Sequence, residues 1–332
     1  MKVVDRCILN SKTKSVHAST IEFWNGHPVF SWFGGSKEGA QDVALYIENL
    51  HGNGNVLSTG NNDATPRWNP ILFSHEGELY LFEKAGIFCD RWQTIIHNLT
   101  ETKEGATGTE IRKGCQILPA GLNGPVKTRP VIHNGEIICG SSVETFCDWA
   151  SYMETYQVKG GQWVFKGRSN PIFPERKAYD YYGNQRVSLG IIQPAIWKDE
   201  SGLHSVFRSS RGLDNIFYSK GEDSCSWSTP METKLPNPNS GIDVATIGNR
   251  AFLVYNPDNR FRMPLNIAEI RVGNGEIEVV DEITVTKEIH DVVDIQTFTD
   301  ELSYPYMIAY EGRLHLVYTV GRTKIEYVVV EI

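Results

Sequence analysis

The chain has 332 residues, a formal net charge of -8 at pH 7, and a composition that is 40% hydrophobic and 11% aromatic, with 30 glycines and 15 prolines. The acidic balance argues against a general nucleic-acid binder, which usually presents a basic surface, although it leaves room for a local cationic pocket. The turn-rich, aromatic composition is typical of an all-β protein with enough apolar residues for a large core.

The first predicted element is a lone strand at residues 3–9, and the last is an alternating strand at residues 325–332. A ring of sheets must close, and pairing the first strand with the last hides both exposed edges. We therefore expect residues 3–9 to complete the final sheet. The N-terminal residues contain no long apolar stretch, so we expect no signal peptide, no transmembrane span and a cytoplasmic protein, with secretion left open.

One unit recurs between these two strands. Each copy begins with a polar or charged residue, usually before a proline, and continues through an apolar strand, a turn at a glycine and a second strand. This pattern predicts a β-hairpin. Six copies, each about 50 to 60 residues long, predict a six-bladed β-propeller that occupies residues 1–332 as one domain. The copies begin near residues 17, 68, 129, 193, 241 and 304.

Long polar segments are expected between the blades, at residues 51–67, 100–125, 166–190 and 286–302. Such loops in a compact domain are often functional, so we expect them to wall a pocket. The segment 166–190 suits an acidic or sugar ligand, although a solvated loop is an equal alternative. It carries Arg168, Arg176, Lys177, Tyr179, Tyr181, Tyr182 and Arg186.

The two open ends of a hairpin lie at the same edge of its sheet. The open ends of all six hairpins are therefore expected to converge on one face near the propeller axis. The first strands bring His17, Asn69, Arg129, Gln193, Asp243 and Tyr304, and the second strands bring Lys84, Glu144, Arg208, Asn256 and Tyr318.

No cofactor and no metal site is predicted, because the chain has no phosphate-binding loop, dinucleotide fingerprint, GxSxG, HxH or HExxH pattern. No pair of the six cysteines has CxxC spacing, and we expect mostly buried thiols, with one or two disulfides as the alternative. The cysteines are Cys7, Cys89, Cys115, Cys139, Cys147 and Cys225.

The stretch from Ser219 to Trp227 reads Ser-Lys-Gly-Glu-Asp-Ser-Cys-Ser-Trp. It approximates the Asp box, Ser-x-Asp-x-Gly-x-Thr-Trp, but it is one residue longer and lacks the glycine. With this stretch and its six repeats, the chain resembles the sialidase family, and more closely the sialidase-like proteins built from degenerate Asp-box (BNR) repeats. The resemblance covers all six blades, and it implies a six-bladed propeller and a glycosidase.

Sialidases hold the substrate carboxylate with three arginines, use a Tyr–Glu pair as nucleophile and an Asp as general acid. The resemblance implies that the acid is Asp42, which follows the first blade's opening position by 25 residues. It implies that Arg208 is the second arginine and that Arg262, rather than Arg260, is the third. Tyr304, in a Ser-Tyr-Pro element that opens the last blade, holds the place of the nucleophile.

Two positions depart from the family pattern. The first arginine is replaced by His17, and the glutamate, 15 residues before the second arginine, is replaced by Gln193. A phenol needs a base before it becomes a good nucleophile, and an amide is not that base. Strict sialidase activity is therefore not expected, whereas an acidic or modified sugar remains a suitable ligand for the two arginines, with two lysines nearby.

The predicted catalytic residues are Asp42, Tyr304, His17 and Gln193, and the predicted substrate-binding residues are Arg208, Arg262, Arg211, Lys84, Lys127, Asn69, Trp68, Glu144, Asp243, Asn256, Tyr318 and Arg322. Each has a structural alternative: a turn cap for the aspartate, an ion pair for Arg208, core packing for the histidine and the aromatic residues, and backbone hydrogen bonds for the amides.

Three functions stay open. The first is an exo-acting glycosidase on a terminal acidic or modified sugar. The second is a lyase on uronate-containing glycans, with His17 and Tyr304 sharing the base and acid roles. The third is a glycan-binding propeller without catalysis. In each case the expected partner is a glycan, with no nucleic acid and no membrane, and no oligomeric state follows.

Overall fold

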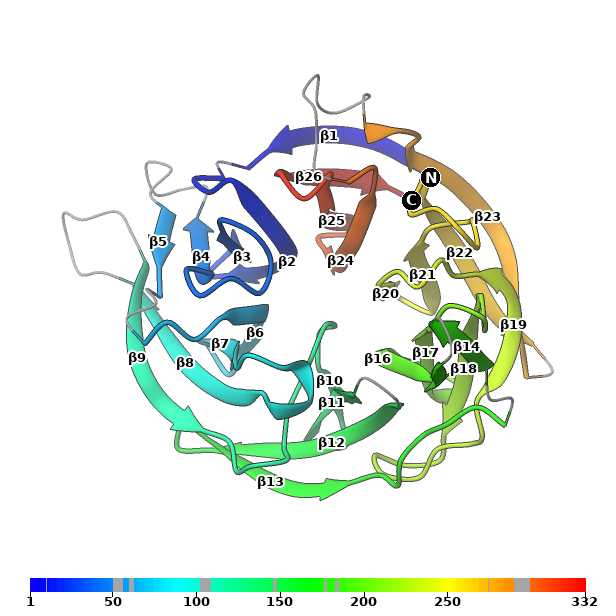
Figure 1. Cartoon of the computed structure of the whole chain (residues 1–332), viewed down its shortest axis with the longest axis horizontal. Helices are drawn as coiled ribbons and strands as arrows, with labels where there is room; N and C mark the ends of the chain where they lie inside the picture. Colours follow the sequence, from blue (N-terminus) through cyan, green and yellow to red (C-terminus); the bar gives the residue numbers. More distant parts are fainter. Residues whose placement is uncertain are drawn as a thin grey trace.

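The computed structural model of the protein describes residues 1–9, 11–49, 56–59, 63–101, 109–145, 148–175, 178–182, 185–273, 275–289 and 299–332. Over these residues the chain forms a six-bladed β-propeller, in which six four-stranded antiparallel sheets stand around a central axis (Figure 1). The predicted fold is confirmed.

In each of the first three blades, the strands follow one another in chain order from the inner to the outer position. Blade one has β2 (Ser15–Trp24), β3 (His27–Gly35), β4 (Ala44–Asn49) and β5 (Val56–Ser58). Blade two has β6 (Arg67–His75), β7 (Glu78–Ala85), β8 (Gln93–Glu101) and β9 (Thr109–Ile117). Blade three has β10 (Val131–His133), β11 (Glu136–Glu144), β12 (Trp149–Lys159) and β13 (Gln162–Arg168).

The remaining blades follow the same order. Blade four has β16 (Ile191–Asp199), β17 (Gly202–Ser209), β18 (Asn215–Gly221) and β19 (Met231–Pro236). Blade five has β20 (Asp243–Ile247), β21 (Arg250–Tyr255), β22 (Leu265–Gly273) and β23 (Glu276–Thr286). Blade six has β24 (Leu302–Tyr310), β25 (Arg313–Val320) and β26 (Lys324–Glu331), with β1 (Lys2–Ile8) as its outer strand.

The N-terminal strand closes the ring. β1 pairs antiparallel with β26, from Lys2 opposite Glu331 to Ile8 opposite Glu326. Figure 1 shows the two chain ends beside each other at this blade. The pairing covers the backbone edge that β26 would otherwise expose, as the sequence predicted.

The expectation of four long loops was wrong in part, because strands occupy some of these segments. β5 lies within the first segment and β9 within the second. In the third segment, β14 (Ala178–Tyr182) pairs with β15 (Gln185–Leu189) as a separate ribbon. Among the described residues, a 3-10 turn, η1 (Cys89–Arg91), also interrupts blade two.

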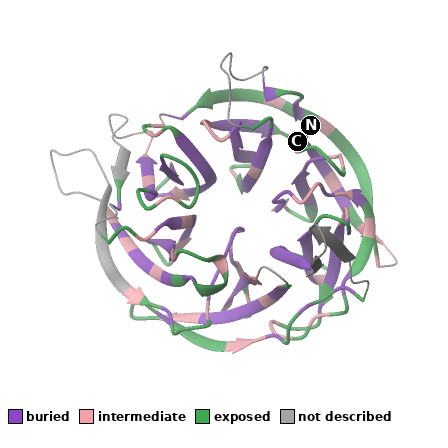
Figure 2. Cartoon of the chain, viewed as in Figure 1, coloured by how far each residue is buried: buried purple, intermediate pink, exposed green. Residues whose placement is uncertain are grey.

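The core lies between the blades, where the inner strands are buried on both faces. All but one residue of β2 are buried, whereas most of β1 is exposed, and Figure 2 shows this gradient from the axis outward. Of the cysteines with described side chains, Cys7, Cys89, Cys139 and Cys225 are free thiols, and only Cys139 is buried. The side chains of Cys115 and Cys147 lie outside the described residues.

The inner strands of four blades share one irregularity. In β2, β6, β16 and β24, the pairing register with the next strand shifts near the start of the strand, as it does at a β-bulge. A residue with positive φ sits at each shift, and in three blades a proline follows it. These residues are Ala18 (φ 51°), Asn69 (32°), Gln193 (54°) and Tyr304 (52°). The bulges alter the direction of side chains at the axis.

The degenerate Asp box forms a turn between β18 and β19. The Asp223 carboxylate accepts hydrogen bonds from the backbone N–H groups of Cys225 and Ser226, both at 2.7 Å. The Ser219 hydroxyl donates to the Ser228 carbonyl oxygen at 2.6 Å. The turn lies on the outer part of blade four and serves the fold.

Candidate functional site

Side chains from blades four and six meet at the hydroxyl of Tyr304. This residue sits on the bulge of β24, and its hydroxyl oxygen accepts hydrogen bonds from Arg208 Nη1 at 2.9 Å and from Gln193 Nε2 at 3.2 Å. Arg208 Nη1 also donates to Gln193 Oε1 at 3.1 Å. Two inner-strand bulges and the end of β17 therefore bring three of the predicted site residues together.

A carboxylate from blade three completes this group. Glu144, at the end of β11, lies with its Oε1 3.3 Å from Gln193 Nε2. Burial raises the pKa of Glu144, against the opposing effects of Arg208 and of the hydrogen bond from Gln193. The amide nitrogen of Gln193 thus stands between a phenol oxygen and a carboxylate oxygen.

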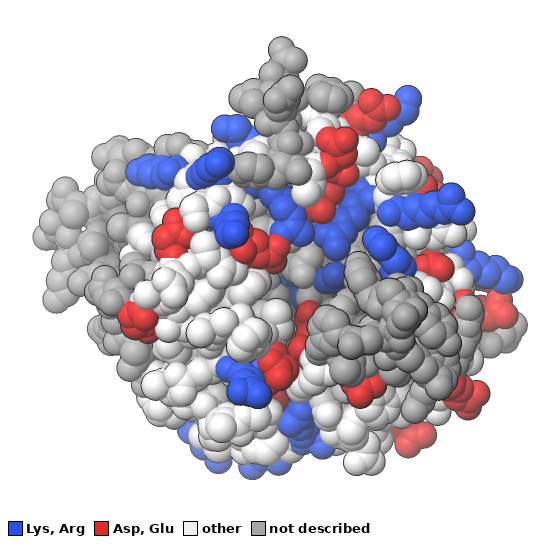
Figure 3. Space-filling view, in the orientation of Figure 1, with Lys and Arg blue, Asp and Glu red and all other residues white. Residues whose placement is uncertain are grey.

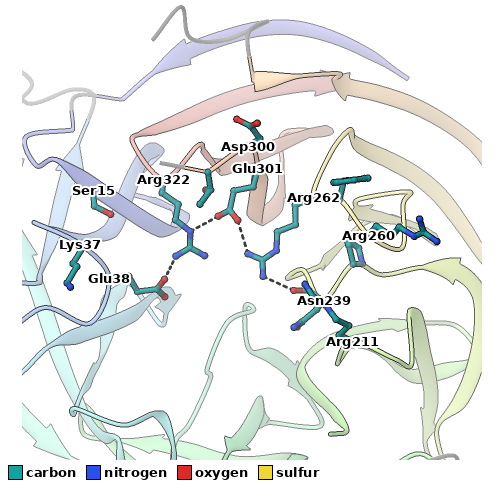
Figure 4. Close-up of a pocket in the computed structure, with 13 residues that line it drawn as sticks. Ser15, Lys37, Glu38, Arg211, Asn239, Arg260, Arg262, Asp300, Glu301 and Arg322 are labelled. Atoms are coloured by element: carbon teal, nitrogen blue, oxygen red, sulfur yellow. Dashed lines mark hydrogen bonds and ion pairs between the residues drawn. The ribbon is translucent and has the colours of Figure 1, made fainter. Parts of the chain in front are cut away.

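Arg208 belongs to a cluster of three arginines that shared acceptors hold in place. Figure 4 shows the other two, Arg262 and Arg322, on either side of Glu301. Arg208 donates through Nε and Nη2 to Asn239 Oδ1 at 3.0 and 2.8 Å, and Arg262 Nη2 donates to the Asn239 carbonyl oxygen at 2.8 Å. Glu301 accepts from Arg262 Nη1 at 3.1 Å and from Arg322 Nε at 2.8 Å. The third guanidinium thus comes from the turn between β25 and β26, not from blade one.

The positive charges of these arginines affect one another. Burial lowers the pKa of Arg262, and the nearby Arg208 lowers it further. Figure 3 shows Lys and Arg side chains gathered around the hollow near the axis, although the whole chain is acidic. An anionic ligand would relieve this repulsion, because it would place negative charge among the guanidinium groups.

His17 lies behind the phenol ring. Its imidazole centroid is 4.3 Å from that of Tyr304, and the side chain is buried. Burial, together with the positive charges of Arg322, Arg262 and Arg208, lowers its pKa well below the usual value. Neither ring nitrogen has a hydrogen-bond partner among the described residues. The histidine is therefore a neutral imidazole at neutral pH.

A cavity of about 660 Å³ opens beside the arginines. Arg211 of the predicted binding set reaches it, and so does Glu38, which is ion-paired with Arg322. The lining residues are Ser15, Lys37, Glu38, Arg211, Pro238, Asn239, Arg260, Phe261, Arg262, Thr299, Asp300, Glu301 and Arg322.

Sequence reasoning missed Glu38 and chose Asp42 in the same loop. The Asp42 carboxylate accepts hydrogen bonds from the backbone N–H and the hydroxyl of Ser36, both at 2.9 Å, and it does not line the cavity. Its contacts match the turn-capping alternative. The available signal for Glu38 was its position in the loop between β3 and β4, four residues before the chosen aspartate.

Both predicted lysines are buried and do not reach the cavity. Lys84 donates to Thr94 Oγ1 at 3.1 Å and to the Asn123 carbonyl oxygen, and burial lowers its pKa to about 7. Lys127 donates to the Pro305 carbonyl oxygen, with its Nζ 6.0 Å from the Tyr304 ring centroid, and burial lowers its pKa to about 8. Through these hydrogen bonds to backbone carbonyl groups, the two lysines support the inner strands.

Asp243 and Tyr318 are also internal. The Asp243 carboxylate accepts from the backbone N–H groups of Val244 and Met307, both at 2.9 Å, and burial raises its pKa to about 6. The Tyr318 hydroxyl lies between Thr286 Oγ1, at 2.6 Å, and the Glu326 carboxylate. These contacts are structural, so the predicted binding role is not supported for either residue.

The two remaining predicted amides satisfy backbone groups. Asn69 Nδ2 donates to the Val126 carbonyl oxygen at 3.0 Å. Asn256 Nδ2 donates to the carbonyl oxygens of Pro264 and Leu302 at 2.9 and 3.0 Å. Both side chains are buried, and their contacts agree with the structural alternative.

Two further residues have contacts away from the arginines. Trp68 donates from its indole N–H to the Gly86 carbonyl oxygen at 2.7 Å and packs against Trp92, with ring centroids 5.8 Å apart. Arg129 was expected at the same face, but its Nε is 2.8 Å from Glu22 Oε2 in a separate hollow that is also lined by residues 196–198. That hollow lies toward the other end of the inner strands.

Part of the segment 166–190, which was expected to wall the pocket, lies outside the described residues. This applies to Arg176 and Lys177, and to the side chains of Tyr179, Tyr181, Tyr182 and Arg186. Across the described ranges, no cluster of three or more His, Cys, Asp or Glu side chains is arranged to bind a metal ion. No described helix has the length and hydropathy of a membrane span.

Comparison with known proteins adds a family and a fold. Residues 26–316 match the family described as "BNR repeat-like domain". No curated protein sequence matches the chain. Among solved structures, Trypanosoma rangeli sialidase in complex with the inhibitor DANA superposes with a TM-score of 0.65 at 13% identity, over 96% of this chain and 55% of that one. The chain thus spans about half the length of that sialidase.

Two other similar structures are glycoside hydrolases. The NanB sialidase from Streptococcus pneumoniae has a TM-score of 0.63 at 9% identity, over 100% of this chain and 70% of that one. Penicillium chrysogenum alpha-L-arabinanase complexed with arabinobiose has a TM-score of 0.59 at 11% identity, over 100% of this chain and 99% of that one. At these identities the likeness establishes the propeller fold alone.

Proposed function

Because the chain belongs to the BNR repeat-like domain family and shares its propeller with glycoside hydrolases, we propose that it is an exo-acting glycosidase that removes a terminal acidic or modified sugar. The observation that carries this proposal is the cluster of Arg208, Arg262 and Arg322, which Asn239 and Glu301 link together and from which Arg208 donates to the Tyr304 hydroxyl. Fold alone does not assign an activity, whereas these side chains offer a specific chemistry.

The arginines are suited to bind a carboxylate. A planar guanidinium matches a carboxylate with two parallel hydrogen bonds, and such charge-assisted bonds are short and strong. Asn239 and Glu301 fix the orientation of all three groups before a ligand arrives. A sugar whose carboxylate binds here would have its ring beside the phenol oxygen.

The same arrangement supports glycoside cleavage. Tyr304 would attack the anomeric carbon, as the tyrosine of sialidases does in place of one carboxylate of the usual pair. The leaving oxygen needs a proton, and Glu38 is one of the carboxyls that line the cavity, together with Asp300 and Glu301. The resemblance favours Asp42 for this role, so Glu38 and Asp42 are both candidates for the general acid.

A lyase is the second candidate, and His17 is the observation that favours it. Its imidazole is neutral and has no hydrogen-bond partner in the described part of the chain, and it lies against Tyr304. The arginines would neutralise a uronate carboxylate and so acidify the adjacent C–H group. A lyase would release an unsaturated product that absorbs in the ultraviolet.

The test is incubation of the purified protein with sialylated and uronate-capped oligosaccharides, followed by mass spectrometry of the products. Hydrolysis adds one water, and elimination adds none. We expect hydrolysis, and we expect Tyr304→Phe to abolish it while Tyr310→Phe, which removes a hydroxyl from a ring stacked on Phe23, leaves it intact.

The outcomes separate the candidates. A greater loss in Glu38→Gln than in Asp42→Asn would identify Glu38 as the acid, and the reverse order would favour Asp42. An ultraviolet-absorbing product would replace the hydrolase with the lyase. Saturable binding of an acidic sugar without any turnover would replace both with a glycan-binding propeller.

A further inference from the structure

The cavity beside the arginine cluster holds a surplus of positive charge. Five cationic and three carboxyl side chains line it, so two positive charges remain uncompensated, although the whole chain has a net charge of -8. A terminal sugar with one carboxylate neutralises only one of them. The cations are Lys37, Arg211, Arg260, Arg262 and Arg322, and the carboxyls are Glu38, Asp300 and Glu301.

The arginines of the cavity form an inner and an outer pair. The inner pair, Arg262 and Arg322, shares the Glu301 carboxylate. The side chains of the outer pair, Arg211 and Arg260, are exposed and make no hydrogen bond or ion pair with any residue that the structure describes. Figure 4 shows the outer pair beyond Arg262, on the side of the cavity away from Arg322. The outer guanidinium groups are therefore available to a ligand.

Short turns hold the outer pair at the rim of the cavity. Arg211 follows β17, in a turn where the Gly212 N–H donates to Asp214 Oδ1 at 2.8 Å. Arg260 follows β21, and its own backbone N–H donates to Asp258 Oδ1 at 2.6 Å. Each of these two segments also supplies one arginine of the cluster around Glu301 and Asn239. A ligand that contacts both the cluster and the rim would therefore need two separate anionic groups.

We propose that the substrate carries a second anionic group on the sugar next to the terminal one, and that Arg211 and Arg260 bind this group. The inference rests on the proposed exo-acting hydrolase. The terminal sugar would place its carboxylate at the inner arginines and its ring beside Tyr304, so the rest of the glycan has to extend past the exposed rim. A carboxylate or a sulfate ester there would accept charge-assisted hydrogen bonds from the guanidinium groups.

A role in solubility alone is the competing explanation, because exposed arginines often face only solvent and a single exposed ion pair contributes little. The two explanations differ in their predictions for matched substrates. A solubility role gives no preference between a neutral and an anionic second sugar. Direct contact gives a preference that depends on the outer arginines and on salt, since the Debye length falls from about 10 Å at 0.1 M to about 3 Å at 1 M.

The experiment uses three substrates that differ only at C6 of the second sugar. A terminal sialate, or in a second series a terminal glucuronate, is linked to galactose, to galacturonate or to galactose 6-sulfate. We expect kcat/KM for the two anionic forms to exceed that for the galactose form about tenfold at low ionic strength, as two partly exposed ion pairs would give. In about 1 M salt the preference should fall below threefold.

Variants assign the preference to the outer pair. Arg211→Gln/Arg260→Gln should reduce the preference at low ionic strength below threefold, whereas Arg271→Gln, which removes an exposed arginine of β22, should retain it. Calorimetric Kd values for the same compounds report the preference without turnover. The salt series on the wild-type protein tests the same contacts if the double variant folds poorly.

Each outcome decides the inference. Equal kcat/KM for the three substrates overturns it and leaves the hydrolase in place. A preference that persists in the double variant and in high salt also overturns it, because the arginines would not be its cause. A preference for galacturonate alone or for the sulfate ester alone supports it and identifies the anion. Absence of any turnover overturns the hydrolase, and equal Kd values would then overturn the second anion site as well.

Discussion

Arg322 shows how one residue can complete a site from an unexpected blade. Its Nε donates a hydrogen bond to Glu301 and its Nη1 pairs with Glu38. Arg322 therefore links blade six to the loop between β3 and β4 of blade one. The family pattern takes an arginine from the first blade, where this chain has a buried His17. The positive charge is therefore present at the same centre, but it is supplied by the last blade.

Replacement of Arg322 should weaken binding more than chemistry. We expect Arg322→Gln to raise KM for an acidic sugar about 10- to 100-fold, since hydrogen bonds to charged groups contribute about 1.5–3 kcal/mol. The control is Arg271→Gln, on the exposed surface of β22. Steady-state kinetics would contradict the assignment if both variants had the same KM.

Lys84 makes a prediction about stability and pH. Burial depresses its pKa in the folded protein to about 7, below the ordinary 10.5. Between these two values the unfolded chain binds more protons than the folded one, so the contribution of Lys84 to stability rises with pH over this window and is least favourable below pH 7.

The variant Lys84→Met removes this dependence. We expect the stability of Lys84→Met relative to wild type to be greater at pH 6 than at pH 9. Urea denaturation at both pH values would measure this difference. Lys198→Met, at an exposed lysine, is the control. An unchanged difference between wild type and Lys84→Met at the two pH values would contradict the prediction.

At the scale of elements, the site depends on the close approach of β11 to β16. A Cβ atom on Gly140 of β11 would lie 2.4 Å from the Pro194 carbonyl oxygen, in the bulge that carries Gln193. No side chain fits there without a backbone shift. The spacing between these strands therefore determines where Gln193 stands relative to Glu144.

The variant Gly140→Ala should disturb both stability and activity. We expect a loss of about 1–3 kcal/mol in unfolding free energy, the usual range for overpacking, together with reduced kcat. Gly273→Ala is a matched control, because its Cβ would meet only the flexible Glu278 side chain at 3.9 Å. Equal thermal shifts for the two variants would refute the steric argument.

The elements also show what the sequence could predict. The hairpins were predictable because period-two alternation and glycine turns, as at Gly202, are local signals. The bulges were not, because a residue before proline normally adopts extended backbone, whereas Gln193 and Tyr304 have positive φ. Glu38 was missed for a related reason: which loop carboxyl reaches the cavity depends on the turn that Asp42 caps, and spacing alone does not contain that information.

At the scale of the whole molecule, the ring depends on one long-range pairing. β1 and β26 share six register pairs between chain positions more than 300 residues apart. Removing residues 1–8 would leave the edge of β26 exposed and lose these ladder bonds. We expect a loss of about 3–6 kcal/mol, from about 0.5–1 kcal/mol for each pair, and a tendency to associate through the open edge.

Thermal unfolding and size-exclusion chromatography would check this. Arg6→Ala is the control, because it removes the contacts of that side chain with Glu326 and the Val285 carbonyl oxygen but keeps the backbone ladder. A truncated protein that melts at the same temperature as the control and keeps the oligomeric state of the wild-type protein would show that the ring closes without its outermost strand.

The late position of Tyr304 and Arg322 has a consequence for the order of events during synthesis. Blades one to five emerge from the ribosome first, and each hairpin can form from near neighbours in the chain. β1 has to wait for β26, which is completed only at Glu331. Tyr304 and Arg322 therefore meet their partners only after blade six has been made, so that shorter nascent chains would lack the arginine cluster.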